Sequence, residues 1–560
     1  MKKRHKLLLI FVISLVLLTV VYFYEVNTPA PNVDLSLKET VTLSFKSDTL
    51  NRYKQNWLKK NESGLWEMYL EGEPFERGLA FGALTQQLHQ QKEAAFVAEI
   101  NNRVPSPNYI SFLKYFVGWF NRDLEKYIPE EYLKEIYGSA QFMSDEFDYI
   151  APKFHRSLNY HAAHDLGHAL QNMNLVGCTS FATVGKNSKN EPQIIVGRNF
   201  DFYFGDDFAK DKIVAFVAPQ EGYKFMSVTW ADFSGVVSGM NEHGLTVTLN
   251  SAKTRILAKA KTPVSIIARH ILQYASTIDE AYEIASSYES FVAETYLISS
   301  AKDNKVAVIE KSPDATAIYV SPNQQTVVTN HFQSKELKNN EQNLEYLEEG
   351  VSQYRYKRVE ELLAKVDTLT PEKAAGILRD KDGLGGKDIG LGNEKAVNQL
   401  IAHHAVIFSP HERKAWVSAP PYQLGKMICY DLDSIFAQAR ETNLPHELHN
   451  DSLSIQPDAF LGTKAYEEYR FFAQTTERIR TILHAGVPDE ISESEAEHYV
   501  ASNPNSYLPY LYLGDYYLEK EQFAKAKDLL EKGLTKEIAR NAEKAHMEEG
   551  VLECTKQLEK

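Results

Sequence analysis

The sequence predicts an α+β protein in which helices pack on both faces of two stacked sheets. From residue 178 to residue 249, short runs rich in β-branched and aromatic residues are separated by Gly, Asn and Asp at the spacing of hairpins. Helical blocks at residues 263–287 and 353–378 alternate with further strand-like runs, the last of which ends near residue 417. Antiparallel strands that alternate with helical pairs are typical of sheets whose outer faces are covered by helices.

Composition limits the classes of protein that the chain can form. Its 560 residues predict two or three domains, and 43% hydrophobic residues are enough for a large core. A formal net charge of −14 leaves no basic excess to neutralise phosphates, so we expect no nucleic-acid partner. With only three cysteines the chain is not a disulfide scaffold, and Cys429 and Cys554 lie in contexts typical of core packing.

The N-terminus predicts a signal anchor and tether over residues 1–34. A basic flank at residues 2–6 precedes residues 7–24, which carry no charge and end in aromatic side chains. About 20 apolar residues span a bilayer, and aromatic side chains favour its interface. The positive-inside rule then predicts an extracytoplasmic body, periplasmic or extracellular. The alternative is a long signal peptide that is cleaved near residue 30.

Three sections follow the tether. The pattern of residues 35–177 is mainly helical, residues 178–454 form the α+β section, and residues 455–560 are helical again. Within residues 507–534 the spacing matches one tetratricopeptide repeat, a helix–turn–helix pair that must pack on neighbouring helices. The residues that match are Tyr510, Leu513, Gly514, Tyr517, Ala526 and Leu530. We expect a small C-terminal appendage with a surface for a protein partner; an ordinary helical hairpin is the alternative.

Cys178 is the residue with the most distinctive context, because it follows Gly177 at the start of a strand-like run. A thiol attacks an amide carbonyl as a thiolate, so it needs a base and donors for the oxyanion. If the bond before Cys178 is cut, the freed α-amine, with a pKa of about 8, can be that base. Glycine at position 177 leaves this bond open to attack and tolerates strained backbone angles. The alternative is a buried cysteine that only packs.

Polar residues at the ends of the following strand-like runs suit the same chemistry. Arg198 and Asp201 lie near the end of the next run. An arginine lowers the pKa of a nearby thiol, and an aspartate holds an amine in place. Asn250 and Asn330 stand at the ends of two further runs, where their amides suit oxyanion donation. Taken singly, each of these residues is more often a turn residue.

Five motifs in this order resemble the N-terminal-nucleophile hydrolases. The motifs are Gly-Cys-Thr at 177–179, Gly-Arg-Asn-x-Asp-Phe at 197–202, Gly-Met-Asn-Glu-x-Gly-Leu at 239–245, Leu-Asn-Ser at 249–251 and Thr-Asn-His-Phe at 329–332. Within these hydrolases the chain resembles the group of isopenicillin-N acyltransferase-like and choloylglycine hydrolases, which includes bile salt hydrolases, penicillin V acylase and acid ceramidase. The resemblance covers residues 150–435, about half of the chain.

The resemblance implies a four-layer αββα sandwich and a precursor that cuts itself between Gly177 and Cys178. Cys178 resembles the nucleophile whose own α-amine is the base, and Arg198 and Asp201 resemble the pair that orients it. Bile salt hydrolases expose their cysteine by losing a methionine or a short leader. Here 177 residues precede Cys178, as in the acyltransferase and ceramidase branches, which weakens the expectation of a bile-acid substrate.

Three further roles are implied by the same resemblance. Asn250 resembles the oxyanion donor that acts through its backbone N–H, and Asn330 resembles the donor that acts through its side-chain amide. Arg355 resembles the later active-site arginine of the group. Arg358, three residues on, competes for that role.

Together these features predict a membrane-anchored, self-cleaving cysteine amidohydrolase or acyltransferase. The expected substrate is a small N-acyl amine or N-acyl amino acid whose linear amide is cleaved through a thioester on Cys178. The alternative is a non-catalytic, membrane-anchored binding or scaffold protein that holds partners through its helical sections.

Two other patterns bear on cofactors. His161, His164 and His168 share one helix face at a spacing that can bind zinc, with Asp165 as a further candidate ligand. A packing or substrate-cleft face is the favoured interpretation, so we expect no metal. The glycine-rich residues 382–388 lack the spacing of a phosphate-binding loop, so we expect no cofactor.

Overall fold

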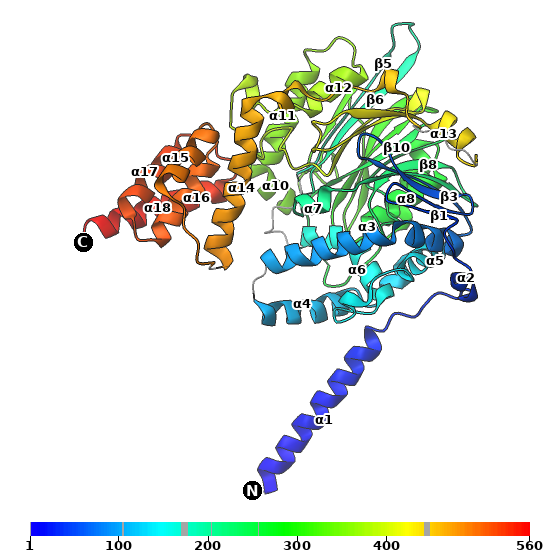
Figure 1. Cartoon of the computed structure of the whole chain (residues 1–560), viewed down its shortest axis with the longest axis horizontal. Coiled ribbons are helices and arrows are strands. Elements are labelled where there is room, and N and C mark those ends of the chain that lie inside the picture. The colour runs from blue at the N-terminus through cyan, green and yellow to red at the C-terminus, as the bar shows by residue number, and fades with distance from the viewer. Residues whose placement is uncertain are drawn as a thin grey trace.

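A computed structural model of the chain describes residues 2–103, 106–169, 177–202, 204–255, 257–441, 448–485 and 487–560. Its body contains two β-sheets, with helices against them and a helical C-terminal region beside them (Figure 1). The predicted mixed α+β composition is confirmed.

The larger sheet combines strands from before and after Cys178. Its neighbouring strands pair antiparallel, except for β4 and β7, which are parallel with Trp66 opposite Ile213 and Gly72 opposite Pro219. In spatial order the strands are β1 (Phe45–Lys46), β2 (Leu50–Tyr53), β3 (Asn56–Lys60), β4 (Trp66–Gly72), β7 (Ile213–Pro219), β8 (Phe225–Thr229), β9 (Ser238–Asn241), β10 (Leu245–Ser251), β11 (Glu294–Ser300), β12 (Lys305–Lys311) and β13 (Thr316–Tyr319).

The smaller sheet begins immediately after Cys178. Its central hairpin pairs β5 with β6 antiparallel, and Ser180 lies opposite Arg198. This register brings the start of one strand to the end of the next, which is the part of the sheet that carries the candidate site. In spatial order the strands are β14 (Gln325–Val328), β5 (Thr179–Lys186), β6 (Pro192–Phe200), β15 (His404–Ser409), β16 (Lys414–Ser418) and β17 (Met427–Asp431).

Strand β7 shows why the two sheets pack face to face. Its sequence is apolar at successive positions, and successive side chains point to opposite faces of a sheet. Val214 and Phe216 join a buried cluster that also contains Val406 of the smaller sheet. Ala215 and Val217 join a second cluster on the other face. The alternation therefore buries one face of the sheet against its partner sheet and the other against helices.

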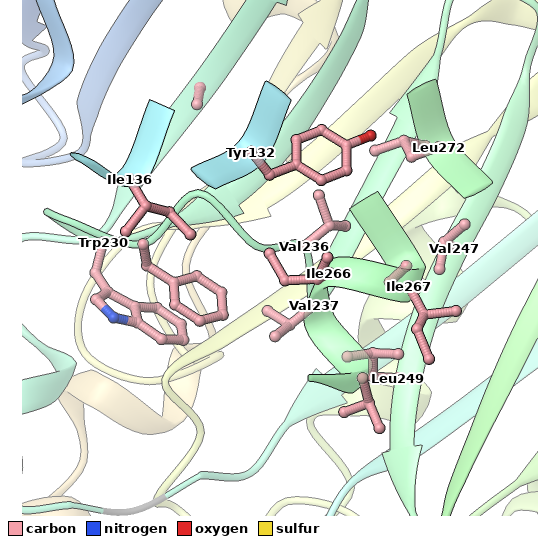
Figure 2. Packing of buried hydrophobic residues seen from close by; sticks show 14 of the residues in the cluster. Tyr132, Ile136, Trp230, Val236, Val237, Val247, Leu249, Ile266, Ile267 and Leu272 are labelled. Atoms are coloured by element: carbon pink, nitrogen blue, oxygen red, sulfur yellow. The ribbon is translucent and has the colours of Figure 1, made fainter. Parts of the chain in front are cut away.

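Helices cover the outer face of each sheet. On the larger sheet, Tyr132 and Ile136 of α5 and Ile266 of α8 pack near Val247 and Leu249 of β10 (Figure 2). On the smaller sheet, helices α11 and α12 bury apolar side chains against β5, β6, β14 and β15. The body helices are α2 (Ser36–Glu39), α3 (Pro74–Arg103), α4 (Pro107–Phe120), α5 (Glu130–Ala140), α6 (Lys153–Ala169), α7 (Asp206–Ala209), α8 (Val264–Tyr274), α9 (Ile278–Ser287), α10 (Glu341–Glu348), α11 (Val351–Leu363), α12 (Pro371–Leu378) and α13 (Leu432–Gln438).

The N-terminal section differs from its predicted, mainly helical pattern. Strands β1–β4 lie within it and extend the larger sheet. These strands are short, and β4 is buried at consecutive positions, so no period-two alternation marks it in the sequence. The pairing with β7, far along the chain, decides its conformation. The section is therefore part of the main fold.

The C-terminal region consists of helical pairs that pack on the body. Two glycines allow close helix contact: a Cβ on Gly514 would lie 2.5 Å from Leu530, and one on Gly533 would lie 2.2 Å from Met547. Leu400 and Leu424 of the body join the apolar cluster of this region. The helices are α14 (Lys464–Ala485), α15 (Glu493–Ser502), α16 (Leu508–Glu519), α17 (Phe523–Leu534) and α18 (Asn541–Leu558).

Helix α1 (Lys2–Glu25) projects away from the body (Figure 1). Residues His5–Glu25 are long and apolar enough to span a membrane. Its last turn meets α4, where Tyr22 stacks on Trp119 and its hydroxyl donates to the carbonyl of Tyr115 at 2.9 Å.

Candidate active site

Cys178 lies at the entry to β5 and is only 1% exposed. Arg198, on the neighbouring strand β6, points Nη2 at the Cys178 sulfur from 3.7 Å. The carbonyl oxygen of Asp201 lies 4.0 Å from the same sulfur. The β5–β6 hairpin therefore brings together the three residues that the sequence motifs link.

Arg198 is held from several directions. Its Nη1 donates to the carbonyl of Val237 at 2.9 Å and to the hydroxyl of Ser238, and Nη2 donates to the carbonyl of Leu249. The guanidinium also lies 4.3 Å from the ring centroid of Phe200. Because these partners come from both sheets, the position of the guanidinium beside Cys178 is fixed by the sandwich itself.

Burial dominates the electrostatics of the thiol. Loss of solvation raises the pKa of Cys178 to about 11, although Arg198 acts in the opposite direction. The expected effect of the arginine is therefore present but smaller than the effect of burial. In the uncleaved chain the thiol is protonated at neutral pH.

Asp201 is a fully buried carboxylic acid next to the bond before Cys178. Its carbonyl accepts a hydrogen bond of 3.0 Å from the backbone N–H of Gly177. Burial raises the pKa of its carboxyl to about 7, while Arg355 and Arg198 oppose the shift. A carboxyl with this pKa can exchange a proton near neutral pH.

Arg355 connects the two ends of the site. From the buried face of α11, its Nη1 donates to the carbonyl of Cys178 at 2.7 Å and to the hydroxyl of Thr179 at 2.8 Å. Its Nη2 donates to Oδ1 of Asn330 at 2.7 Å. Arg358 instead forms a paired contact with Asp380, at 2.8 Å for both bonds. The structure thus brings Arg355, and not Arg358, to Cys178.

Asn330 lies two residues after β14 and is engaged by its neighbours. Its Nδ2 donates to the carbonyl of Ser251 at 3.1 Å and to the Ser251 hydroxyl at 2.9 Å. Its Oδ1 accepts from Arg355, which fixes the orientation of the amide. In the uncleaved chain this amide is already occupied as a donor.

Asn250, on β10, faces the space between the sheets. Its Oδ1 accepts from the Ser180 hydroxyl at 2.7 Å, and its Nδ2 donates to the carbonyl of Val328 at 3.3 Å. These bonds tie β10 to β5 and β14 next to the site. Asn250 therefore bonds to the strand that follows Cys178, whereas Arg198, Asp201 and Arg355 contact the Gly177–Cys178 segment directly.

Gln399 is a site residue that sequence reasoning missed. It lies in the loop before β15, is 3% exposed, and donates from Nε2 to the carbonyl of Gly177 at 2.8 Å. Nε2 is also 3.5 Å from Oδ2 of Asp201. A glutamine in a loop 222 residues away carries no motif, so only the fold reveals the contact.

A buried histidine pair contacts Ser238, which bonds Arg198, and sequence reasoning also missed this pair. His404 contacts the Ser238 hydroxyl through Nε2 at 2.8 Å, and its Nδ1 lies 2.9 Å from Nδ1 of His403. Burial lowers the pKa of both histidines well below the usual range. Both rings are therefore neutral at physiological pH and position Ser238 without adding charge.

The histidine face of α6 has a spacing that could suit a metal ion. Both ring nitrogens of His161 are engaged, with Ser157 O at 2.8 Å and with the N–H of Ser234 at 2.9 Å. The side chains of His164 and His168 lie outside the described residues. Asp165 accepts from the N–H of Val264 at 2.9 Å. Among the described residues, no group of three or more His, Cys, Asp or Glu is arranged to hold a metal ion.

The two neighbouring arginines of α11 allow a matched test of the site. If the expected self-cleavage and amide turnover occur, Arg355→Lys should slow both about 10- to 100-fold. The single nitrogen of an ammonium cannot reach acceptors on two segments as the separate Nη1 and Nη2 of the guanidinium do, and each charged hydrogen bond contributes about 1.5–3 kcal/mol. Arg358→Lys, the control, weakens the pair with Asp380 and leaves turnover per cleaved chain intact. The turnover rates of both variants on one substrate show which arginine belongs to the site. Equal losses of rate would contradict the assignment of Arg355.

The central part of the chain is similar to known acyltransferases and amidases. Residues 186–421 match a family model described as acyl-coenzyme A:6-aminopenicillanic acid acyl-transferase. The matched stretch begins after Cys178. An uncharacterized protein of Archaeoglobus fulgidus is 24% identical over 276 residues, which are 46% of this chain and 45% of that protein. An N-acylethanolamine-hydrolyzing acid amidase of Caenorhabditis elegans is 26% identical over 258 residues, 44% of this chain and 68% of that protein.

Two solved structures are also similar. The Caenorhabditis elegans ortholog of N-acylethanolamine-hydrolyzing acid amidase has 20% identity and a TM-score of 0.32, covering 42% of this chain and 93% of that one. A mutant conjugated bile acid hydrolase of Clostridium perfringens has 12% identity and a TM-score of 0.31, covering 45% of this chain and 92% of that one. The chain spans about half the length of the archaeal relative. The sequence matches confirm the resemblance of the central part of this chain to the N-terminal-nucleophile hydrolases and acyltransferases.

Proposed function

We propose that the chain is a self-activating cysteine amidase or acyltransferase in which Cys178 becomes the nucleophile after the bond to Gly177 is cut. The observation that carries this proposal is the convergence of Arg198, Asp201 and Arg355 on the Gly177–Cys178 segment. The family-model match and the nematode amidase support the reaction type.

The proposed cycle uses the residues of this cluster. The α-amine freed on Cys178 takes the thiol proton, and the sulfur bonds to the acyl carbon of the amide. The N–H of Asn250 and the side-chain amide of Asn330 stabilise the oxyanion. The C–N bond then breaks, the leaving amine takes the proton from the α-amine, and a thioester remains. Water releases the acid and restores the thiol; an amine in place of water gives acyl transfer.

The uncleaved structure explains why activation is needed in this proposal. The nitrogen of Cys178 is part of a peptide bond, so its lone pair is delocalised into the carbonyl and is not basic. The thiol is protonated because burial raises its pKa. The amide of Asn330 donates to Ser251 and must change partner before it can serve a substrate. Cleavage frees the α-amine that acts as the base, so the precursor is inactive until it is cut.

We propose N-acyl amines or N-acyl amino acids as the substrate class. The nematode relative is named for hydrolysis of N-acylethanolamines, and the family model is named for acyl transfer to an amine. Both named reactions involve a bond between an acyl group and nitrogen. A cysteine with an amine base attacks the carbonyl carbon of such a bond. A free small molecule fits this chemistry, and no cofactor is required.

The proposed architecture assigns residues 178–454 to the catalytic domain, as an αββα sandwich. Three buried clusters support the layers of this sandwich, one between the sheets and one under each helical layer. Two of these clusters also contain side chains from residues 53–162, so the N-terminal piece packs into the same sandwich. Residues 35–177 then form the separate N-terminal piece, and residues 455–560 form a tetratricopeptide-like appendage whose helices are available to a protein partner. The pairing of α16 with α17 at Gly514 supports the appendage.

We propose that α1 anchors the chain in a membrane, with the body outside the cytoplasm and α4 at the bilayer surface. Helix α4 carries one charged residue, Lys114, and it meets the end of α1 through Tyr22. Five of its aromatic side chains are 40–59% exposed. Exposed apolar patches beside a membrane anchor favour the interface. The exposed residues are Tyr109, Phe112, Tyr115, Phe116 and Trp119.

Labelling tests this placement. A fluorophore on Phe112→Cys of the full chain in vesicles is expected to lose most of its emission when the lipids carry nitroxide groups, because its side chain lies in the interface. The matched control is Leu552→Cys on α18, since Leu552 is 60% exposed and Phe112 is 59% exposed. Equal emission at both positions would overturn the placement of α4.

The proposed function is tested by the N-terminus of the purified protein. We expect two pieces of about 20 and 44 kDa, in proportion to the lengths of the two parts of the 63.7 kDa chain, with Cys178 first in the larger. A panel of N-acyl amides with a thiol-directed trap then identifies the acyl group. An intact chain that binds partners without turnover would favour a scaffold protein instead.

A further inference from the structure

The carbonyl of the bond that would be cut has a dedicated hydrogen-bond donor. Nε2 of Gln399 lies 2.8 Å from the oxygen of Gly177. The glutamine is 3% exposed and reaches this oxygen from the loop that precedes β15. The role of this donor rests on the proposed self-cleavage and concerns the step that produces the active enzyme.

The peptide unit around this carbonyl is held on both sides. The N–H of Gly177 donates to the carbonyl of Asp201 at 3.0 Å. One residue on, the carbonyl of Cys178 accepts from Arg355 at 2.7 Å. The Gly177 oxygen therefore has a fixed direction, and Gln399 is placed to meet it without reorganisation.

The absence of a side chain at Gly177 leaves room for this donor. A Cβ at position 177 would lie 2.7 Å from Nε2 and 2.9 Å from Oε1 of Gln399, closer than real Cβ contacts. The close approach of the glutamine amide is therefore a structural reason for glycine at this position.

We propose that Gln399 is the oxyanion donor of self-cleavage. The sulfur of Cys178 bonds to the carbonyl carbon of Gly177, and the charge that develops on the carbonyl oxygen is stabilised by Nε2. The C–N bond breaks and the thiol proton ends on the nitrogen of Cys178. Water then adds to the thioester, which releases the Gly177 carboxylic acid and returns the thiol. The amine that remains is the base for later turnovers.

This donor is distinct from those assigned to turnover. The donors assigned to turnover are the backbone N–H of Asn250 on β10 and the side-chain amide of Asn330 beyond β14, which bonds Ser251. In the part of the chain that the structure describes, the amide of Gln399 bonds Gly177 and approaches Asp201. Once the bond is cut, the oxygen that Gln399 holds belongs to the N-terminal piece. Maturation and turnover therefore depend on different amides.

The test replaces the donor with a side chain of similar size. In full-length Gln399→Met we expect the conversion of precursor, followed by intact mass, to slow about 100-fold, the usual effect of losing one oxyanion donor. Turnover per cleaved chain should fall less than tenfold. The matched control is Gln423→Met, because Gln423 is fully buried and its amide has no partner among the described residues.

The outcomes separate this inference from the proposed function. If wild-type chain never cleaves, the proposed function fails. If wild-type chain cleaves and Gln399→Met cleaves at the same rate, only the role of Gln399 fails. A variant that loses its native thermal transition is replaced by Gly177→Ala, whose Cβ displaces the glutamine amide. Gly177→Ala alone should slow cleavage. When it is added to Gln399→Ala, the cleavage rate should fall little further, because the amide is already absent. Additive losses of cleavage rate would overturn the proposal.

Discussion

Cys178→Ala is expected to remain a single chain of 63.7 kDa and to hydrolyse no amide. Without the sulfur there is no nucleophile to attack the Gly177 carbonyl and none to form an acyl thioester. Both losses are complete because the proposed mechanism uses the same atom twice. Intact mass after prolonged incubation and an N-acyl amide assay measure the two losses on one preparation.

The other buried cysteines provide the control for this prediction. Cys429→Ala on β17 removes a sulfur that is fully buried against the outer helices of the smaller sheet. It should affect stability and leave cleavage and turnover in place. Fragments from Cys178→Ala would show that another residue or a protease cuts the chain, and the self-cleavage proposal would then be abandoned.

Asp201→Asn is expected to stabilise the uncleaved chain, increasingly so at higher pH. The folded protein raises the pKa of Asp201 from 3.8 to about 7, so the protonated carboxyl is favoured by folding. Its contribution to stability is complete below about pH 4 and is lost as the pH rises through 7. A neutral asparagine avoids this loss. At 1.36 kcal/mol per pKa unit the gain approaches about 4 kcal/mol at pH 8.

The measurement uses the Cys178→Ala background, so that both chains stay uncleaved. Denaturant midpoints with and without Asp201→Asn should diverge from pH 4 to pH 7 and then run parallel. Asp433→Asn is the control of opposite sign, because Arg413 lowers the pKa of Asp433 and the charged form stabilises the fold. A stability difference that does not change with pH would show that folding does not raise the pKa of Asp201.

The local part of the site could be predicted from the sequence, since the β5–β6 hairpin fixes which residues meet. Twenty residues separate Cys178 from Arg198, and a hairpin of that length pairs its ends. The choice between Arg355 and Arg358 needed the structure, because one helical turn separates two side chains that face different partners. The motifs gave no means of telling them apart.

Contacts between distant segments explain what the sequence could not reveal. Gln399 meets Gly177 because the loop before β15 folds back across the end of β6. Strands β1–β4 acquire their conformation from the pairing of β4 with β7, across more than 140 residues. Neither relation leaves a periodic pattern, whereas helices with one apolar face do. Long-range pairing is a property of the whole fold and is absent from any local window.

The parallel pairing of β4 with β7 has a consequence for the life of the mature protein. If the chain is cut before Cys178, the segment that bears the apolar helix α1 and the segment that bears Cys178 remain joined by backbone hydrogen bonds inside one sheet. Unfolding would then let two molecules diffuse apart, and renewed folding would become a second-order encounter that depends on concentration. Maturation would be a one-way step, after which persistence of the enzyme depends on the rate of unfolding.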